Sequence, residues 1–109
     1  MNILVVDDHP FIHEFLGGVL RGVFGEVTLR FAGSLADALD KAAAGPAPDM
    51  ATLDLVLPDC AGVETLLQFR KAQPEARVVV FSALEEHAHV MGALEAGAAG
   101  YLHTHQARR

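Results

Sequence analysis

The sequence has little of several features that mark particular classes of protein. Its 109 residues include one cysteine, Cys60, no tryptophan and only 6% aromatic residues. A lone cysteine makes no internal disulfide and no cysteine metal cluster, which favours a reducing compartment. Few aromatics argue against a stacking platform for single-stranded nucleic acid. No apolar run approaches the ~18–20 residues that span a bilayer, and the first residues carry no basic segment typical of a signal peptide. We therefore expect a cytoplasmic protein with no membrane partner.

Positive charge is also scarce. Eight Lys and Arg stand against fourteen Asp and Glu, which gives a formal net charge of −6 with His neutral. The basic residues are scattered until Arg108-Arg109, so no face resembles a patch that follows a phosphate backbone. We expect that this chain alone does not bind DNA. Hydrophobic residues at 51% and charged residues at 20% exclude a disordered chain, and the length predicts one domain over 1–109.

Short apolar runs alternate with longer segments of helical period. The predicted strands cover 3–6, 27–31, 50–53, 78–81 and 98–102. Runs that are apolar throughout are typical of strands buried on both faces of a parallel sheet, whereas the alternating second strand suits an edge. The pattern predicts an α/β fold with a doubly wound, flavodoxin-like parallel sheet of five strands. Its strand order is 2-1-3-4-5, with helices on both faces.

The intervening segments carry helix signals. Pro10 suits a first helical turn, and the apolar residues that follow it at four-residue steps predict one buried stripe: Phe11, Phe15, Val19 and Val23. Ser34 followed by Asp37 resembles a capping box. Further helices are predicted over 63–70 and 85–96, and Gly97 is the expected C-cap of the last.

Polar residues follow the ends of the predicted strands. In open α/β sheets, function lies beyond these carboxyl ends, where the strand order reverses. Asp7 and Asp8 follow the first strand, Asp54 the third and Ser82 the fourth. Two unit charges 4 Å apart repel by about 4 kcal/mol at an effective dielectric near 20. Three converging carboxylates therefore favour a hard divalent cation, Mg²⁺ foremost. The alternative is that Asp7 and Asp8 cap the first helix and that Asp54 begins a loop.

Four segments, taken together and in order, resemble the receiver domain of two-component response regulators. They are Val5-Val6-Asp7-Asp8-His9-Pro10, Asp54-Leu55-Val56-Leu57-Pro58 with Gly62, Phe81-Ser82-Ala83, and Gly97-Ala98-Ala99-Gly100-Tyr101-Leu102. The resemblance covers nearly the whole chain. The Asp-Asp-His-Pro start is similar to receivers that precede a helix-turn-helix DNA-binding domain, which would belong to a longer protein.

The resemblance implies a phosphorylation-dependent signalling module rather than an enzyme. Asp54 would accept a phosphoryl group from a sensor histidine kinase or a phosphotransfer protein. The implied Mg²⁺ ligands are Asp7, Asp8, Asp54 and the backbone carbonyl of Val56. The Ser82 hydroxyl would close on the phosphoryl group, and Tyr101 would swing inward with it. The alternatives of a turn hydroxyl for Ser82 and an edge aromatic for Tyr101 remain open.

The chain departs from the receiver pattern near its end. Thr104 stands where receivers carry a lysine that reaches the phosphoryl group, and threonine supplies no positive charge. His105 follows where the family commonly has proline, and we expect a trans bond before it. Only five residues follow Thr104, so we expect the fifth helix of receivers to be missing or truncated. Receivers use the flank of the fourth helix and fifth strand for output and homodimers.

Two functional interpretations follow from this departure. The chain is either a working phosphoacceptor with altered lifetime or coupling, or a degenerate receiver that acts as a phosphorylation-independent interaction module. A zinc site built from His87, His89, His103 and His105 is a weaker hypothesis than scattered surface histidines. A flavin site would need a phosphate loop rich in hydroxyl residues and glycine after the first strand. A hydrolase of the aspartyl-phosphate type would need its nucleophile after the first strand and a lysine elsewhere. Cys60 is interpreted as an inert small side chain.

Overall fold

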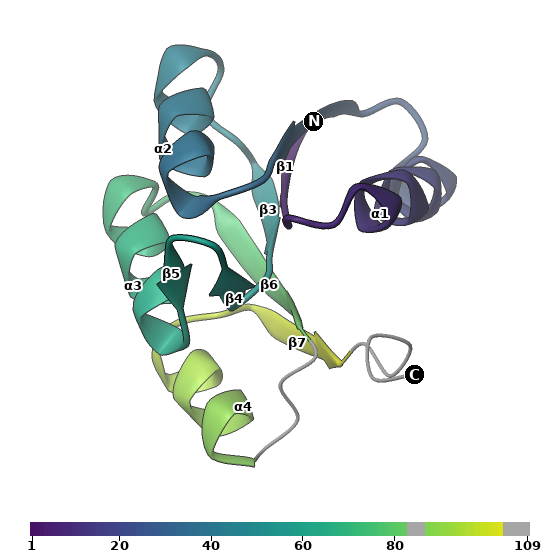
Figure 1. Ribbon diagram of the computed structural model, residues 1–109. Coiled ribbons are helices and arrows are strands. Elements are labelled where there is room, and N and C mark those ends of the chain that lie inside the picture. Colours follow the sequence, from purple (N-terminus) through teal and green to yellow (C-terminus); the bar gives the residue numbers. More distant parts are fainter. Residues whose placement is uncertain (83–86, 104–109) are drawn as a thin grey trace.

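The computed structural model describes residues 1–82 and 87–103 and shows a five-stranded parallel sheet between helices (Figure 1). Its strands are β1 (Asn2–Val6), β2 (Thr28–Ala32), β3 (Met50–Leu53), β6 (Arg77–Ser82) and β7 (Gly100–His103). Their order is β2-β1-β3-β6-β7, and every neighbouring pair is parallel. This order confirms the predicted doubly wound sheet, with the alternating strand at one edge.

A small hairpin that the sequence did not predict lies between β3 and the next helix. Its antiparallel strands β4 (Val56–Leu57) and β5 (Cys60–Ala61) are two residues each, too short to show a period. The Gly62 N–H closes the segment by donating to the Leu55 carbonyl at 2.6 Å. The hairpin fixes the loop that leads away from Asp54.

Helices cover the two faces of the sheet unequally (Figure 1). They are α1 (Pro10–Phe24), α2 (Leu35–Ala44), α3 (Val63–Ala72) and α4 (His87–Glu95). Alternate strand residues such as Leu4 and Val6 share a core with α2, α3 and α4, whereas Ile3 and Val5 pack with α1. This two-sided burial explains the uninterrupted apolar strands. None of the described helices is long and apolar enough to cross a membrane.

The predicted helix signals are found at their positions. Pro10 lies in the first turn of α1. Ser34 is the N-cap of α2, and its Oγ accepts the Asp37 N–H at 3.0 Å. Gly97 follows α4 with φ of 100°, a backbone conformation that favours glycine. The predicted start of the fourth helix at 85, the residues from Thr104 onward and the expected missing helix lie outside the described residues.

The predicted buried stripe on α1 is wrong. Phe11, Phe15, Val19 and Val23 are 60%, 58%, 43% and 68% exposed, whereas Leu16 and Leu20 are each 6% exposed and face the sheet. Both sets recur every four residues, so the period alone did not identify the inner face. Gly17 lies on that face, where an added Cβ would lie 3.6 Å from Leu29 Cδ1 and 3.7 Å from the Phe31 ring. The smallest residue thus brings the helix against β2.

Candidate functional site

Three carboxylates converge at the carboxyl end of the sheet. Val6 and Leu53 are partners in the β1–β3 register, so Asp7 and Asp54 leave the sheet side by side. The Asp54 N–H donates to the Val6 carbonyl at 3.0 Å. One ligand atom from each of Asp7, Asp8, His9 and Asp54 lies within 4.8 Å of the others. Strand pairing therefore gathers acidic groups that are almost fifty residues apart in sequence.

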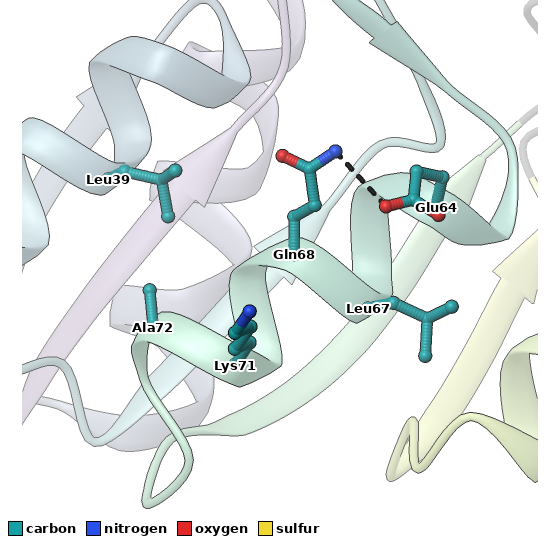
Figure 2. Close-up of a pocket in the computed structure, with 6 residues that line it drawn as sticks. All are labelled: Leu39, Glu64, Leu67, Gln68, Lys71 and Ala72. Carbon is teal, nitrogen blue, oxygen red and sulfur yellow. Dashed lines mark hydrogen bonds between the residues drawn. The ribbon is translucent and has the colours of Figure 1, made fainter.

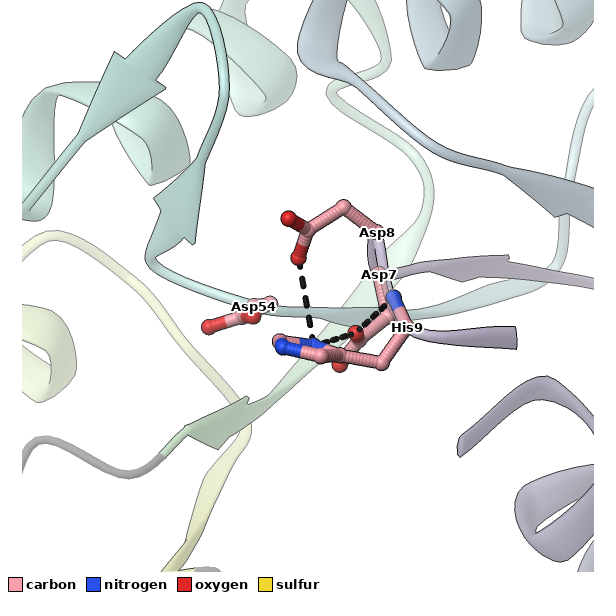
Figure 3. A group of neighbouring side chains, drawn as sticks. All are labelled: Asp7, Asp8, His9 and Asp54. Carbon is pink, nitrogen blue, oxygen red and sulfur yellow. Dashed lines mark hydrogen bonds and ion pairs between the residues drawn. The ribbon is translucent and has the colours of Figure 1, made fainter. Parts of the chain in front are cut away.

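His9 closes over these carboxylates, although sequence reasoning did not select it as a site residue. Figure 3 shows its ring folded back toward the acidic side chains. Its Nδ1 lies 2.8 Å from Asp7 Oδ1 and 3.2 Å from Asp8 Oδ1. The hydrogen bond to Asp7 and the charges of the three carboxylates raise the pKa of His9. The feature of the sequence that could have indicated this role is the position of His9 directly after the two aspartates.

The turn after β1 does not place an aspartate at the helix cap. His9 itself is the N-cap of α1, with φ −103° and ψ 113° and no capping bond from its side chain. Asp7 Oδ1 accepts the His9 N–H at 2.8 Å, and His13 Nε2 lies 2.5 Å from the Asp7 carbonyl. His13 also stacks on Phe31 with ring centroids 5.1 Å apart. The contacts hold Asp7 on the sheet side of the turn, so the helix-capping alternative fails for Asp7 and Asp8.

Asp54 is the most perturbed acid of the site. It is 7% exposed, and this burial, with smaller contributions from the charges of Asp7 and Asp8, raises its pKa to about 6. Hydrogen bonds from the Val56 N–H, at 3.0 Å to Oδ1, and from Ser82 act in the opposite direction. A pKa near 6 leaves the carboxylate mostly ionised at neutral pH, in the form that acts as a nucleophile.

Ser82 and Tyr101 lie on the same side of the site. Ser82 ends β6 and is buried, and it pairs with His103 in the β6–β7 register, two residues beyond the pair of Val80 and Tyr101. Burial raises the pKa of Tyr101, a hydrogen bond with Ser82 lowers it, and the charge of Asp54 raises it. Hydroxyl, phenol and carboxylate are therefore electrostatically linked.

The loop after Asp54 is anchored to α2 by an acid that sequence reasoning missed. Asp59 accepts the backbone N–H groups of Leu35 and Ala36, each at 2.9 Å, through its two carboxylate oxygens. These bonds, that from Ala36 first, lower the pKa of Asp59. The contact spans more than twenty residues, so only the folded topology reveals it. It steadies the hairpin that carries Val56, the residue whose carbonyl was assigned to the cation.

The donor set of the cluster fits a divalent cation. Carboxylate oxygens are ligands that Mg²⁺ and similar hard ions prefer. The raised pKa of Asp54 shows that the cluster accommodates negative charge at a free-energy cost. Asp7, Asp8 and Asp54 are the side chains that would hold such an ion, and a bound ion would offset their repulsion.

Other candidate features lie elsewhere or outside the described residues. A groove of about 630 Å³ lies between α2 and α3. Figure 2 shows the residues that line it: Leu39, Glu64, Leu67, Gln68, Lys71 and Ala72. It includes none of the predicted site residues. Cys60 is half-buried, with its Sγ 3.9 Å from Gln68 Nε2. Thr104 and His105 are outside the described part of the chain. The same holds for the side chains of the other histidines considered for a zinc site, His87, His89 and His103.

The carboxylate cluster at the ends of parallel strands defines an α/β signalling module of the receiver type. The chain belongs to the response regulator receiver domain family, whose pattern it matches over residues 3–108. Receiver domains are signalling modules rather than conventional enzymes. This membership confirms the resemblance deduced from the sequence motifs.

Relatives place the chain among regulators that are longer than it is. It is 40% identical over 106 residues to the transcriptional activator protein ExaE of Pseudomonas putida, covering 94% of this chain and 47% of that protein. It is 36% identical over 107 residues to the nitrate/nitrite response regulator protein NarL of Escherichia coli K12, covering 93% and 46%. The chain thus spans about half the length of these relatives.

A solved structure shares both fold and sequence. A response regulator protein from Burkholderia pseudomallei, crystallised with a phosphorylated aspartic acid, a calcium ion and citrate, is 30% identical. Its TM-score is 0.76, and the match covers 95% of this chain and 59% of that one.

Proposed function

We propose that this chain is a phosphorylation-dependent switch in which Asp54 accepts a phosphoryl group from a sensor histidine kinase or a phosphotransfer protein. The observation that carries the proposal is the convergence of Asp7, Asp8 and Asp54 at the ends of two neighbouring strands. The phosphorylated aspartic acid of the Burkholderia structure supports it.

The transfer uses groups whose positions are set by the fold. A carboxylate oxygen of Asp54 forms a bond to phosphorus while the phosphorus–nitrogen bond of the donor breaks, and that electron pair stays on the donor nitrogen. The Val56 N–H orients the Asp54 carboxylate. A divalent cation, Mg²⁺ in our proposal, supplies positive charge when it is held by Asp7, Asp8, Asp54 and the Val56 carbonyl.

Ser82 and Tyr101 are the residues that we assign to the response. The Ser82 hydroxyl would donate to an oxygen of the transferred group, since it already shares electrostatic contacts with Asp54 and Tyr101. Tyr101 would then move toward Ser82. Thr104 would occupy the place of the family lysine and supply a hydroxyl without charge.

A small-molecule phosphate donor with Mg²⁺ tests the proposal directly. Intact-mass analysis should show one added phosphoryl group on the wild-type chain and none on Asp54→Asn. Asp59→Asn is the matched control, because Asp59 lies in the same loop but bonds to α2, and it should still be modified. No addition to the wild type, or addition that survives Asp54→Asn, would refute it.

Thr104 favours a second candidate, a degenerate receiver that acts as a phosphorylation-independent interaction module. The specific observation is the loss of the lysine charge at that position. If the first proposal holds, Thr104→Lys should strengthen the response to phosphorylation and change the lifetime of the acyl phosphate. An unchanged yield and lifetime would show that the missing cation does not matter.

We also propose where the switch acts and which partners it has. Residues 1–109 would form one cytoplasmic receiver domain, and a DNA-binding effector would lie elsewhere in the full-length protein, as the name of the transcriptional activator ExaE supports. Homodimers would form through α4 and β7. Size-exclusion chromatography at several concentrations tests the dimer, and the gene sequence beyond Arg109 tests the effector.

A further inference from the structure

The ring of His9 faces the acidic residues that would hold a cation (Figure 3). Pro10 restricts the residue before it to extended backbone, and His9 has φ −103° and ψ 113°. Its own N–H donates to Asp7 Oδ1, which turns the side chain back over the carboxylates. The backbone therefore delivers the imidazole to the cluster.

The nitrogen that faces the acids is correctly spaced for shared coordination. Two ligands bound at right angles to one octahedral ion, with bonds of ~2.1 Å, lie about 3 Å apart. His9 Nδ1 lies 2.8 Å from Asp7 Oδ1 and 3.2 Å from Asp8 Oδ1. The whole four-residue set lies within 4.8 Å, close to the ~4.2 Å that separates ligands on opposite sides of such an ion.

The ring has room to adjust to an ion. The side chains of His9 and Asp8 are 54% and 35% exposed, so small rotations need no rearrangement of the core. Phe11 supports the imidazole edge-on, with ring centroids 5.7 Å apart. As a ligand through Nδ1, the neutral ring carries its proton on Nε2.

We propose that His9 is a further ligand of the divalent cation at this site, through Nδ1, and that it shifts the preference of the site from Mg²⁺ toward Mn²⁺ and Co²⁺. Imidazole suits transition metals, whereas Mg²⁺ prefers oxygen ligands. A site of three carboxylates and one imidazole thus differs in selectivity from an all-oxygen site. The inference rests on the cation half of the proposed function.

Mn²⁺ itself is the probe that tests His9. In tag-free chain loaded with Mn²⁺ alone, electron spin echo envelope modulation should detect a directly bonded nitrogen. His9→Ala should abolish that signal, and it removes no helix cap because the His9 side chain makes no capping bond. His13→Gln is the matched control: His13 contacts the Asp7 carbonyl rather than the carboxylates, so the signal should persist.

Calorimetric titration gives a second, independent readout. We expect His9→Ala to weaken Mn²⁺ and Co²⁺ binding about tenfold, which is the lower end of the loss of metal affinity seen when residues around a metal site are replaced. The affinity for Mg²⁺ should change by less than about twofold. Tighter binding of all three ions by His9→Ala would show that His9 only competes with the cation, and would overturn the inference.

The outcomes separate this inference from the proposed function. Mn²⁺ bound without a nitrogen signal, together with phosphorylation of Asp54 in Mg²⁺, would overturn the role of His9 alone. Absence of binding for every cation would overturn both the role of His9 and the cation half of the proposed function.

Discussion

Replacing Asp54 by asparagine should stabilise the fold at neutral pH, although the same change removes the proposed phosphoacceptor. Burial raises the pKa of Asp54 from 3.8 to about 6, so the folded chain binds this proton more tightly than the unfolded chain does. The free energy of unfolding therefore falls as the pH rises through that interval, and the ionised carboxylate remains destabilising above it. Asparagine keeps an oxygen that can accept the Val56 N–H and carries no charge.

The size of the stabilisation follows from the difference between the folded and unfolded pKa of Asp54. A change from 3.8 to about 6 corresponds to about 3 kcal/mol. Water at the open rim of the site offsets part of the cost of burying this charge, so we expect a gain of about 2 kcal/mol for Asp54→Asn at neutral pH. Below the unfolded pKa both forms of residue 54 are neutral, and the gain should disappear.

Urea unfolding of both proteins in EDTA, at about pH 3.5 and about pH 7.5, measures the difference. EDTA keeps divalent cations from masking the repulsion. Asp59→Asn is the control with the opposite sign, because its hydrogen bonds to α2 lower the pKa of Asp59. If Asp54→Asn is no more stable than wild type at neutral pH, or the gain is equal at both pH values, the assignment of a destabilising buried charge to Asp54 is wrong.

Other substitutions test the packing around the site. Leu16→Ala should cost about 2–5 kcal/mol in urea unfolding, whereas Phe15→Ala on the outer face of α1 should change stability by less than about 0.5 kcal/mol; equal losses would contradict the assignment of the inner face. Asp59→Ala should lower the melting temperature at neutral pH, and this loss should shrink in acid, where protonated Asp59 accepts the backbone N–H groups more weakly. Gly97→Ala should destabilise by at least about 1–2 kcal/mol, because of its positive φ and because an added Cβ would displace the Arg70 side chain. Gly22→Ala, at an open helical position, should stabilise by about 0.5–1 kcal/mol; a gain at Gly97 would refute both reasons.

The sheet and the meeting of its acids could be predicted because both follow from one-dimensional patterns. Strands buried on both faces read as unbroken apolar runs, and parallel topology places their carboxyl ends on one edge. Asp7 and Asp54 are then neighbours as a consequence of strand order. The inner face of α1 could not be predicted in this way, because apolar residues at four-residue spacing occur on both of its sides. In the structure the inner side is the one that carries Leu16, Gly17 and Leu20.

Contacts that side chains make across the loops also could not be predicted from the sequence. The bond from Asp59 to α2 needs the hairpin of β4 and β5, whose two-residue strands carry no period. The closure of His9 over the acids depends on a turn geometry that Pro10 permits but does not specify. In our proposal, His9 sets which cation the site prefers, whereas the three carboxylates supply the negative charge that binds a cation.

Stability and cation binding both depend on the buried negative charge of Asp54 at this site. Without a cation, the buried charge of Asp54 and its acidic neighbours destabilises the fold by a few kcal/mol. A ligand that binds only the folded state stabilises it by about 2.7 kcal/mol at a concentration one hundred times its dissociation constant. The two magnitudes are comparable, so an occupied site should restore most of what the clustered acids remove. The stabilising effect of Asp54→Asn should accordingly shrink when a divalent cation is added. The cation should raise the free energy of unfolding of the wild type, whereas the variant lacks one of the carboxylates that would bind the cation.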